Sequence, residues 1–188
     1  MTAPLVTLLA LCLFTAVAAV KDHRTGHIPN PLVAIAAVAG VTLHLALGFR
    51  STDATGHGVG DALANETFTV ALGVVLCAMV PLLLYRVGAM GGGDVKLLGA
   101  IGIVAGPMLG LEIELTAFVV AILFVGARLA YRGELLRLLG NSLALATNPM
   151  RAPEKRRQVP EALMTSLRFA PAVFASTLLS VLAHWHET

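Results

Sequence analysis

A chain of 188 residues that is 57% hydrophobic and only 13% charged does not have the composition of a soluble globular domain. Its mean hydropathy is +0.83, and several apolar runs approach the roughly 17–25 residues that a helix needs to cross a bilayer. The net charge of +2 gives no sign of a nucleic-acid surface, and the two cysteines stand alone in apolar runs, which excludes a CxxC metal site and a disulfide framework. The composition therefore predicts an all-α polytopic membrane protein.

The first apolar run, residues 3–20, is predicted to be a retained transmembrane span. A secretory signal begins with a positively charged segment, and the first 13 residues contain neither Lys nor Arg. A short charged loop over residues 21–30 follows and ends in Ile28-Pro29-Asn30. Because proline disfavours helical geometry in the residue before it, the chain is expected to turn there before the second span.

Hydropathy along the whole chain predicts a single membrane domain, residues 1–188, with six transmembrane helices. A polar loop over residues 50–65 joins the second span to the third, and Glu112 and Glu114 separate the fourth from the fifth, which predicts a tight hairpin. A polar cytoplasmic loop over 132–167 precedes the last span, and residues 134–146 within it have the pattern of an amphipathic helix lying on the membrane. The predicted spans are residues 3–20, 31–49, 66–85, 95–110, 114–131 and 168–183.

The basic residues give the orientation of this predicted bundle. If the first loop is cytoplasmic, all but one of the 13 Lys and Arg residues lie on the cytoplasmic side, and the exception is Arg50. An excess of Lys and Arg in cytoplasmic loops is the usual determinant of orientation. Both termini are therefore predicted to lie outside the cytoplasm.

Two aspartates fall at the cytoplasmic surface of this topology. Asp22 lies where the first span meets the cytoplasm, and Asp94 follows a glycine cluster at the start of the fourth span. The helix dipole alone would explain Asp94 in the first turn of a helix, so the prediction of a functional site depends on both aspartates together. Small residues that favour close helix packing in lipid share a face with each aspartate, so the two faces are predicted to meet. The residues on the face of Asp94 are Leu98, Gly102, Gly106 and Gly110, and those on the face of Asp22 are Thr15, Ala18 and Ala19.

Two carboxylates held a few ångström apart do not readily both ionise, and they share a proton. The ionised member can take a proton from water while the other donates one to a carbonyl oxygen, which is the arrangement of aspartic proteases and uses neither metal nor cofactor. The main alternative is proton-coupled transport, because paired carboxylates in membranes also form proton relays. A third interpretation is a non-enzymatic assembly factor. Against transport, both aspartates lie at one membrane surface, and the chain has no repeated halves.

The residues around the two aspartates resemble those of the type IV prepilin peptidases. The run Gly91-Gly92-Gly93-Asp94, with Val95-Lys96-Leu97 after it, resembles the GxGD motif of that family. Asp22-His23-Arg24 through Ile28-Pro29-Asn30 resembles its first aspartate motif, and Arg168-Phe169-Ala170-Pro171-Ala172 is similar to the segment that opens its last span. The resemblance covers nearly the whole chain, in the same order and topology.

This resemblance implies that Asp22 and Asp94 are the catalytic pair of a prepilin leader peptidase. The implied substrates are prepilins or pilin-like proteins, whose short basic leader is removed at the cytoplasmic face of the bacterial inner membrane. The larger members also methylate the new N-terminus and carry paired CxxC motifs, which this sequence lacks, so it resembles the short, peptidase-only branch of Flp (Tad-type) pili. The expected partners are the protein substrate and membrane lipid. The motif residues expected to support the pair are Gly91, Gly93, Lys96, Arg24, Pro29 and Asn30.

The remaining polar residues have structural or alternative interpretations. Lys96 either tunes Asp94 or extends to the membrane interface, and Arg24 either acts on Asp22 or the substrate or serves as a topology determinant. His44, inside the second span, is predicted to be hydrogen-bonded within the bundle. The carboxylates on the far side are predicted to be solvated loop charges, namely Asp53, Asp61, Glu66, Glu112 and Glu114.

Overall fold

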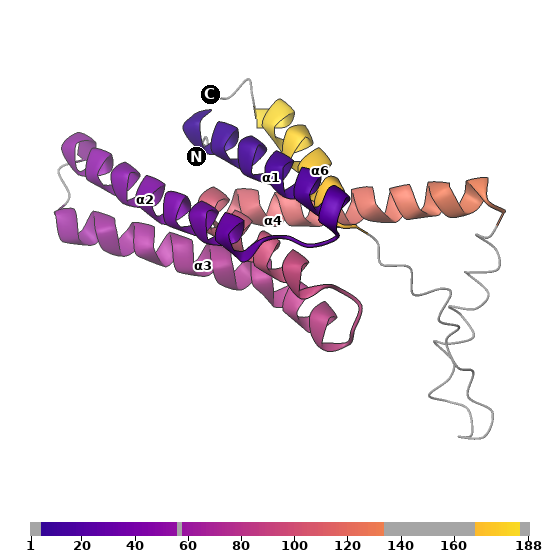
Figure 1. Ribbon diagram of the computed structural model, residues 1–188. Helices are drawn as coiled ribbons and strands as arrows, with labels where there is room; N and C mark the ends of the chain where they lie inside the picture. Colours follow the sequence, from indigo (N-terminus) through magenta and orange to yellow (C-terminus); the bar gives the residue numbers. More distant parts are fainter. Residues whose placement is uncertain (1–4, 56–57, 134–167, 185–188) are drawn as a thin grey trace, which may run out of the picture. The chain divides into compact units, whose positions relative to one another are not determined.

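The computed structural model describes residues 5–55, 58–133 and 168–184, and every regular element in these ranges is a helix. No strand occurs in them, so the predicted all-α class is confirmed for this part of the chain. Four of the helices, α1 to α4, are each long and apolar enough to cross a membrane. The helices are α1 (Leu5–Thr25), α2 (Asn30–Thr55), α3 (Val59–Arg86), α4 (Gly92–Tyr131) and α6 (Ala170–His184) (Figure 1).

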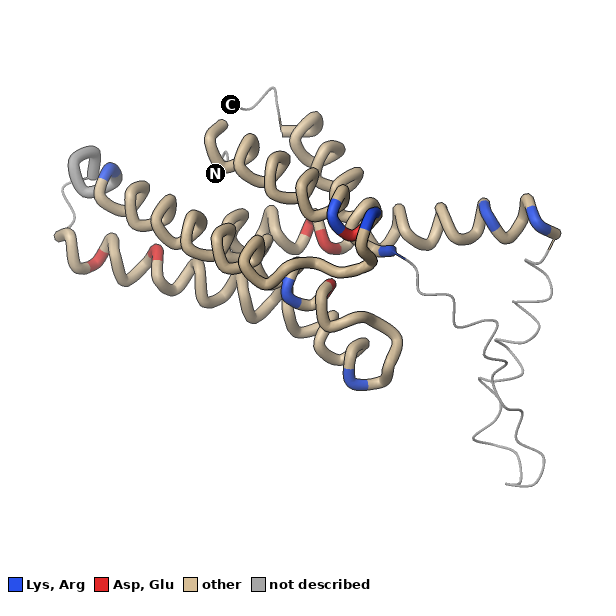
Figure 2. Tube along the Cα trace, in the orientation of Figure 1, with Lys and Arg blue, Asp and Glu red and all other residues tan. Residues whose placement is uncertain are grey.

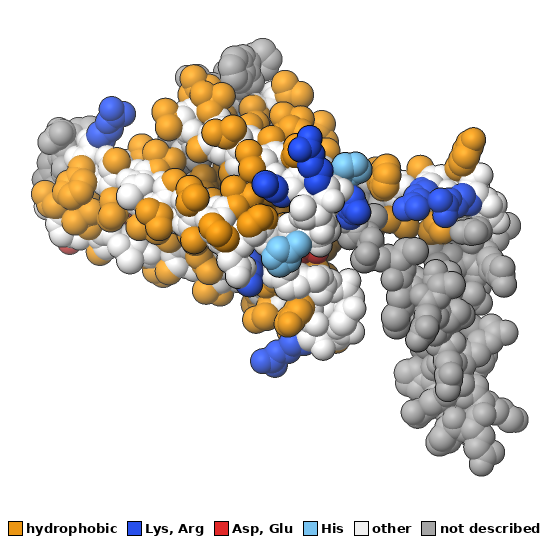
Figure 3. Space-filling model, in the orientation of Figure 1, with side chains coloured by type: hydrophobic (Ala, Val, Ile, Leu, Met, Phe, Trp, Pro, Cys, Tyr) orange, Lys and Arg blue, Asp and Glu red, His pale blue; other side chains and the backbone are white. Residues whose placement is uncertain are grey.

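Large apolar side chains cover much of the visible surface (Figure 3). Leu13, Ile35, Phe68 and Met108 are between 65% and 84% exposed. Water disfavours such a surface, whereas lipid solvates it, and a helix satisfies its own backbone hydrogen bonds inside a bilayer. The exposed apolar faces therefore agree with the predicted membrane class.

The predicted loop over residues 50–65 is wrong for most of its length. α2 continues to Thr55, and α3 already begins at Val59 after the N-cap residue Gly58. Polar residues need not end a helix when their side chains have favourable interactions there. Asp61 lies in the first turn of α3, where the helix dipole favours an acidic side chain. Glu66, one turn later, is bonded to His44 of α2.

The predicted hairpin at Glu112 and Glu114 is also wrong, because the break in α4 lies earlier, at Gly106. Gly106 has φ 74° and ψ −178°, a region that is essentially restricted to glycine, and Pro107 has no N–H to continue the helical hydrogen bonds. The break divides α4 into a first arm, residues 92–105, and a second arm, residues 107–131.

The two arms of α4 fold back on each other at Gly106. A Cβ atom built on Gly110 would lie 3.3 Å from the Cα atom of Gly102, whereas residues eight apart in a continuous helix are separated by about 12 Å. The fourth and fifth predicted spans thus correspond to two arms of one element. α6 has 15 residues and is shorter than the other four, so the prediction of six separate spans is not confirmed.

Small residues bring α3 and the first arm of α4 into backbone contact. A Cβ atom on Gly102 would lie 2.7 Å from the carbonyl carbon of Gly73 and 3.0 Å from the Cβ atom of Cys77. Real Cβ atoms do not approach backbone this closely, so glycine is required at the crossing. The glycine spacing predicts close packing, but the partner of Gly102 is α3 and not α1 as expected.

The described residues belong to two compact units, and each is considered by itself. Residues 5–55, 58–120 and 168–184 form the first unit, and 121–133 belong to the second. In the first unit α1 packs along α6 and α2 packs along α3 (Figure 1). Ser176 Oγ donates to the carbonyl oxygen of Ile113 at 2.6 Å and so joins α6 to the second arm of α4.

The predicted amphipathic helix over residues 134–146 lies outside the described residues. Of the predicted loop over 132–167, the structure describes Arg132 and Gly133, which form a turn after α4. All residues of the candidate site described below belong to the first unit.

Candidate active site

Asp22 lies in the last full turn of α1, on its buried face. The predicted face is correct: Thr15 and Ala18 are fully buried, Ala19 is 8% exposed and Asp22 is 7% exposed. Oδ2 of Asp22 is buried and has no hydrogen-bond partner in the described part of the chain. A carboxylate oxygen buried in this way is costly unless it is used, so this position is notable on physical grounds.

The end of α1 is fixed by hydrogen bonds around Asp22. The backbone N–H of Gly26 donates to the carbonyl of Asp22 at 2.8 Å, and Gly26 has φ 64°, a value that favours glycine. Thr25 Oγ1 donates to the carbonyl of Lys21 at 2.8 Å. The helix therefore stops within one turn of Asp22, and the carbonyls of this turn are occupied.

Asp94 lies in the first turn of α4, directly after the glycine cluster. Its backbone N–H donates to the carbonyl of Gly91 at 3.1 Å. A Cβ atom on Gly91 would lie 3.3 Å from Oδ2 of Asp94, a tighter approach than most side chains make, so Gly91 leaves space beside the carboxylate. Leu98, one turn further on the same face, is fully buried. The prediction that Asp94 lies on a buried face is confirmed, although the face ends at the break at Gly106.

The carboxylates of Asp22 and Asp94 interact electrostatically, although they come from opposite parts of the sequence. Asp22 is at the carboxyl end of α1 and Asp94 at the amino end of α4. Both lie on inward faces, where the repulsion between like charges is screened less than in water. The glycines of the predicted Asp94 face nevertheless lie against α3 and not α1, since Gly102 meets Gly73 and Gly110 meets Cys77. Two interacting acidic groups can hold one shared proton between them.

The segment between α1 and α2 docks on the start of α4. Ile28 is 3% exposed and would lie 3.7 Å from a Cβ atom on Gly93, which is ordinary contact. Lys96 Nζ donates to Asn30 Oδ1 at 3.0 Å. The carbonyl of Pro29 accepts the N–H of Leu32 at 3.1 Å and so starts α2. Residues that follow Asp22 in the chain are in this way tied to residues that flank Asp94.

Positive side chains gather at this end of the first unit. Lys21, Arg24, Lys96 and Arg168 are all exposed, and Figure 2 shows Lys and Arg concentrated where α1 ends and α6 begins. Arg168 Nη1 donates to the carbonyl oxygen of His23, next to Asp22. No sequence pattern indicates this contact, because the two residues are far apart in the chain.

Three other carboxylates do not behave as solvated loop charges. Glu66 Oε2 lies 2.8 Å from His44 Nδ1, and Glu112 Oε2 lies 3.0 Å from His184 Nε2. The prediction of a hydrogen-bonded His44 is confirmed, and the predictions for Glu66 and Glu112 are wrong. Asp61 is exposed, as predicted.

Glu114 is the clearest error among these predictions. It is 1% exposed, in the second arm of α4, and its Oε2 has no hydrogen-bond partner in the described ranges. The misplaced hairpin caused the error, because a turn at Glu114 would have placed the residue in solvent. Within the described residues, no group of three or more His, Cys, Asp or Glu side chains is arranged to hold a metal ion.

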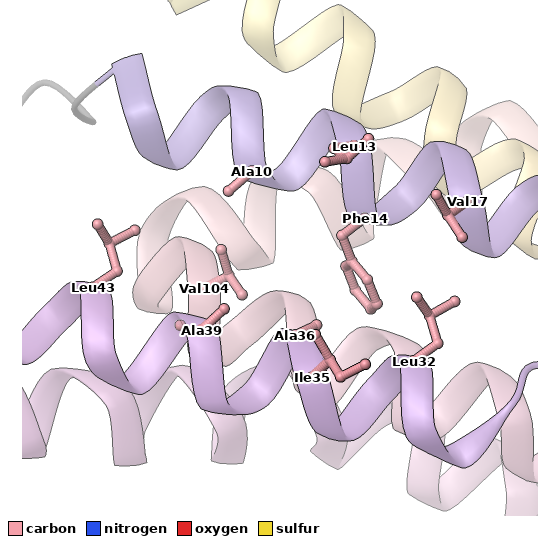
Figure 4. Close-up of a pocket in the computed structure, with 11 residues that line it drawn as sticks. Ala10, Leu13, Phe14, Val17, Leu32, Ile35, Ala36, Ala39, Leu43 and Val104 are labelled. Carbon is pink, nitrogen blue, oxygen red and sulfur yellow. The ribbon is translucent and has the colours of Figure 1, made fainter.

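An apolar cavity of about 330 Å³ lies between α1 and α2 (Figure 4). Phe14 projects from α1 toward α2, and Val104 of α4 also contributes to the lining. All of its lining residues are apolar or glycine, so the cavity contains no group that could transfer a proton. The candidate site is therefore the pair Asp22 and Asp94, at the end of α1 and the start of α4.

Comparison with known proteins identifies the family of this chain. Residues 9–127, more than half of the chain, match the model of the type IV leader peptidase family, and this segment includes both aspartates. No match was found among curated proteins or among solved structures. The chain therefore belongs to the type IV leader peptidase family, which is a family of proteases.

Proposed function

We propose that this protein is an aspartic endopeptidase that removes the short basic leader of prepilins or pilin-like proteins. Asp22 and Asp94 are the proposed catalytic residues. The observation that carries the proposal is the electrostatic interaction of these two inward-facing carboxylates within a chain of the leader peptidase family. Of the two, Asp22 is the more deeply buried and has an oxygen without a partner in the described residues.

The pair would hydrolyse the peptide bond by acid–base chemistry. The ionised aspartate takes a proton from a water molecule, and the oxygen of that water bonds to the carbonyl carbon of the leader's last residue. The protonated aspartate donates its proton to the carbonyl oxygen, which gives a neutral tetrahedral intermediate. When the intermediate collapses and the C–N bond breaks, the aspartate that took the water proton gives it to the leaving nitrogen. The other aspartate takes a proton from a hydroxyl of the intermediate, so the pair again holds one proton.

The glycines before Asp94 support this function because they leave room for the substrate, and they take no part in the reaction. Gly91 is exposed and a side chain there would press on Asp94. An extended substrate backbone has to reach the carboxylates, and glycine permits another backbone to approach closely. Gly93 has a different task, because it faces Ile28 and so contributes to the docking of the α1–α2 segment.

The proposed location of the reaction is the cytoplasmic face of the bacterial inner membrane. Lys21, Arg24, Lys96 and Arg168 are exposed near the pair, and Lys and Arg mark the cytoplasmic side of membrane proteins. In this orientation both termini lie outside the cytoplasm. The leader of a membrane-anchored substrate would reach the pair where its apolar helix emerges from the bilayer.

Proton-coupled transport receives no support from the family to which the chain belongs. The proposal is limited to proteolysis and does not include methylation of the new N-terminus.

Co-expression with a candidate Flp-type prepilin tests the function. We expect a shift of the prepilin to smaller size when the protein is present, and mass spectrometry should find a new N-terminus directly after the basic leader. The matched control is the same prepilin with an empty vector. An intact prepilin beside correctly inserted protein, with several pilin-like candidates tested, would contradict the proposal.

A further inference from the structure

Arg168 stands at a position where the local helix disfavours a positive charge. α6 begins at Ala170, and the N–H groups of Ala172 and Val173 bond to the carbonyl of Phe169 at 2.9 Å and 3.1 Å. Arg168 thus comes immediately before the first turn of α6, where the dipole carries partial positive charge and favours an acidic side chain. A residue that conflicts with its own helix often serves another element.

That other element is α1. Arg168 Nη1 donates to the carbonyl oxygen of His23, and a cation at the carboxyl end of a helix is favourable both for the dipole and for the unpaired carbonyls. The carbonyls of Lys21 and Asp22 are already bonded to Thr25 and Gly26. The carbonyls of Lys21, Asp22 and His23 thus all accept hydrogen bonds, and the donor to His23 comes from a distant segment.

The residues that follow Arg168 at the start of α6 are buried and well packed. Phe169 is 5% exposed and its ring lies 5.3 Å from that of Phe118, centroid to centroid. Ala170 and Val173 are fully buried, and α6 packs along the length of α1. The guanidinium is consequently attached to packed structure on one side and to the turn that carries Asp22 on the other.

We propose that Arg168 is a positioning residue for the reaction: its bond to His23 holds the last turn of α1 so that Asp22 faces Asp94. Arg168 transfers no proton and need not touch the substrate. The inference rests on the proposed function for its effect on catalysis, whereas its effect on the end of α1 stands independently. Small errors in the placement of a catalytic group are enough to slow a reaction strongly.

The first experiment compares steady-state cleavage by Arg168→Gln, Arg168→Lys and Lys21→Gln. Lys21 is an exposed cation directly before Asp22, so its substitution controls for the loss of positive charge. Arg168→Gln should lower kcat about ten- to a hundredfold and leave KM within about twofold, because the leader is bound as before. Arg168→Lys should recover part of kcat, and Lys21→Gln should behave as the wild type.

The second experiment measures the stability of the last turn of α1 without any substrate. Amide hydrogen exchange of residues 24–27 in the intact protein should be about tenfold faster in Arg168→Gln than in the wild type, because the turn opens more often. Exchange in Lys21→Gln should not change. If Arg168→Gln does not insert in the membrane, Arg168→Lys is compared with Lys21→Arg, and slower exchange is expected for Lys21→Arg.

The outcomes separate this inference from the proposed function. Unchanged exchange in the Arg168 variants, unchanged kcat, or an equal loss of kcat in Lys21→Gln would overturn the positioning role. If the wild type cleaves no prepilin but exchange is still faster in Arg168→Gln, the contact between Arg168 and α1 is supported. Only the proposed function is then contradicted.

Discussion

Lys96 Nζ lies 3.0 Å from Asn30 Oδ1 and joins the first turn of α4 to the first residue of α2. Lys96 follows Asp94 by half a turn, and Asn30 ends the segment that follows Asp22. The hydrogen bond therefore connects the two aspartate motifs. Neither of the two roles considered from the sequence, tuning of Asp94 or extension to the membrane interface, included this bridge.

We predict that Lys96 and Asn30 act as one unit. Lys96→Met and Asn30→Leu should each slow cleavage less than about tenfold, because an exposed hydrogen bond contributes only about 0.5–1.5 kcal/mol. The double variant should be no slower than the slower single variant, since both changes remove the same bond. Cleavage rates of the four proteins measure this. Strictly additive losses, as expected for the control pair Lys21→Met and Asn30→Leu, would contradict the bridge.

A second prediction concerns the crossing of α3 and α4. Gly102→Ala should destabilise the protein by about 1–3 kcal/mol, the usual range for overpacking, because its Cβ atom would lie 2.7 Å from the carbonyl carbon of Gly73. Gly99→Ala is the matched control in the same arm, since its Cβ atom would meet nothing closer than Ala78 at 3.9 Å. Thermal or denaturant unfolding in detergent compares them. Equal stability of the two variants would show that the crossing tolerates side chains.

The aspartate pair could be predicted from the sequence because each half has a local signal. Asp94 follows Gly91–Gly93, and Asp22 precedes Ile28-Pro29-Asn30, while small residues mark the inward face of each helix. Hydropathy also identified the apolar stretches of α1, α2 and α3. These features depend on residues near each other in the chain, which is the information that a single sequence contains.

The predicted hairpin at Glu112 and Glu114 is wrong because charged residues do not by themselves end a helix. Gly106-Pro107 contained the better signal, a glycine that can adopt positive φ followed by a residue that cannot continue the helix. Glu112 and Glu114 remain in the helix, one of them bonded to His184 and the other buried. Arg168 illustrates a different limit, because its partner is the backbone of a distant helix and no spacing in the sequence indicates it.

A third prediction follows from the burial of Glu114. Glu114→Leu should raise the thermal midpoint, because it removes a buried carboxyl oxygen without a partner in the described residues and such a group costs about 1–3 kcal/mol. Glu112→Leu, two residues earlier, should not stabilise the protein, since it removes the bond to His184. A lower midpoint for Glu114→Leu than for the wild type would mean that this carboxyl group contributes to folding.

The central claim is that Asp22 and Asp94 together hydrolyse the leader, and steady-state cleavage by the purified, membrane-reconstituted protein tests it most directly. Asp22→Asn and Asp94→Asn keep the shape of each side chain but cannot exchange the shared proton, so each should lower kcat by about a thousandfold. Asp61→Asn, at an exposed carboxylate in the first turn of α3, is the control and should cleave as the wild type does. Substantial cleavage by either Asn variant, at normal levels in the membrane, would contradict the catalytic pair.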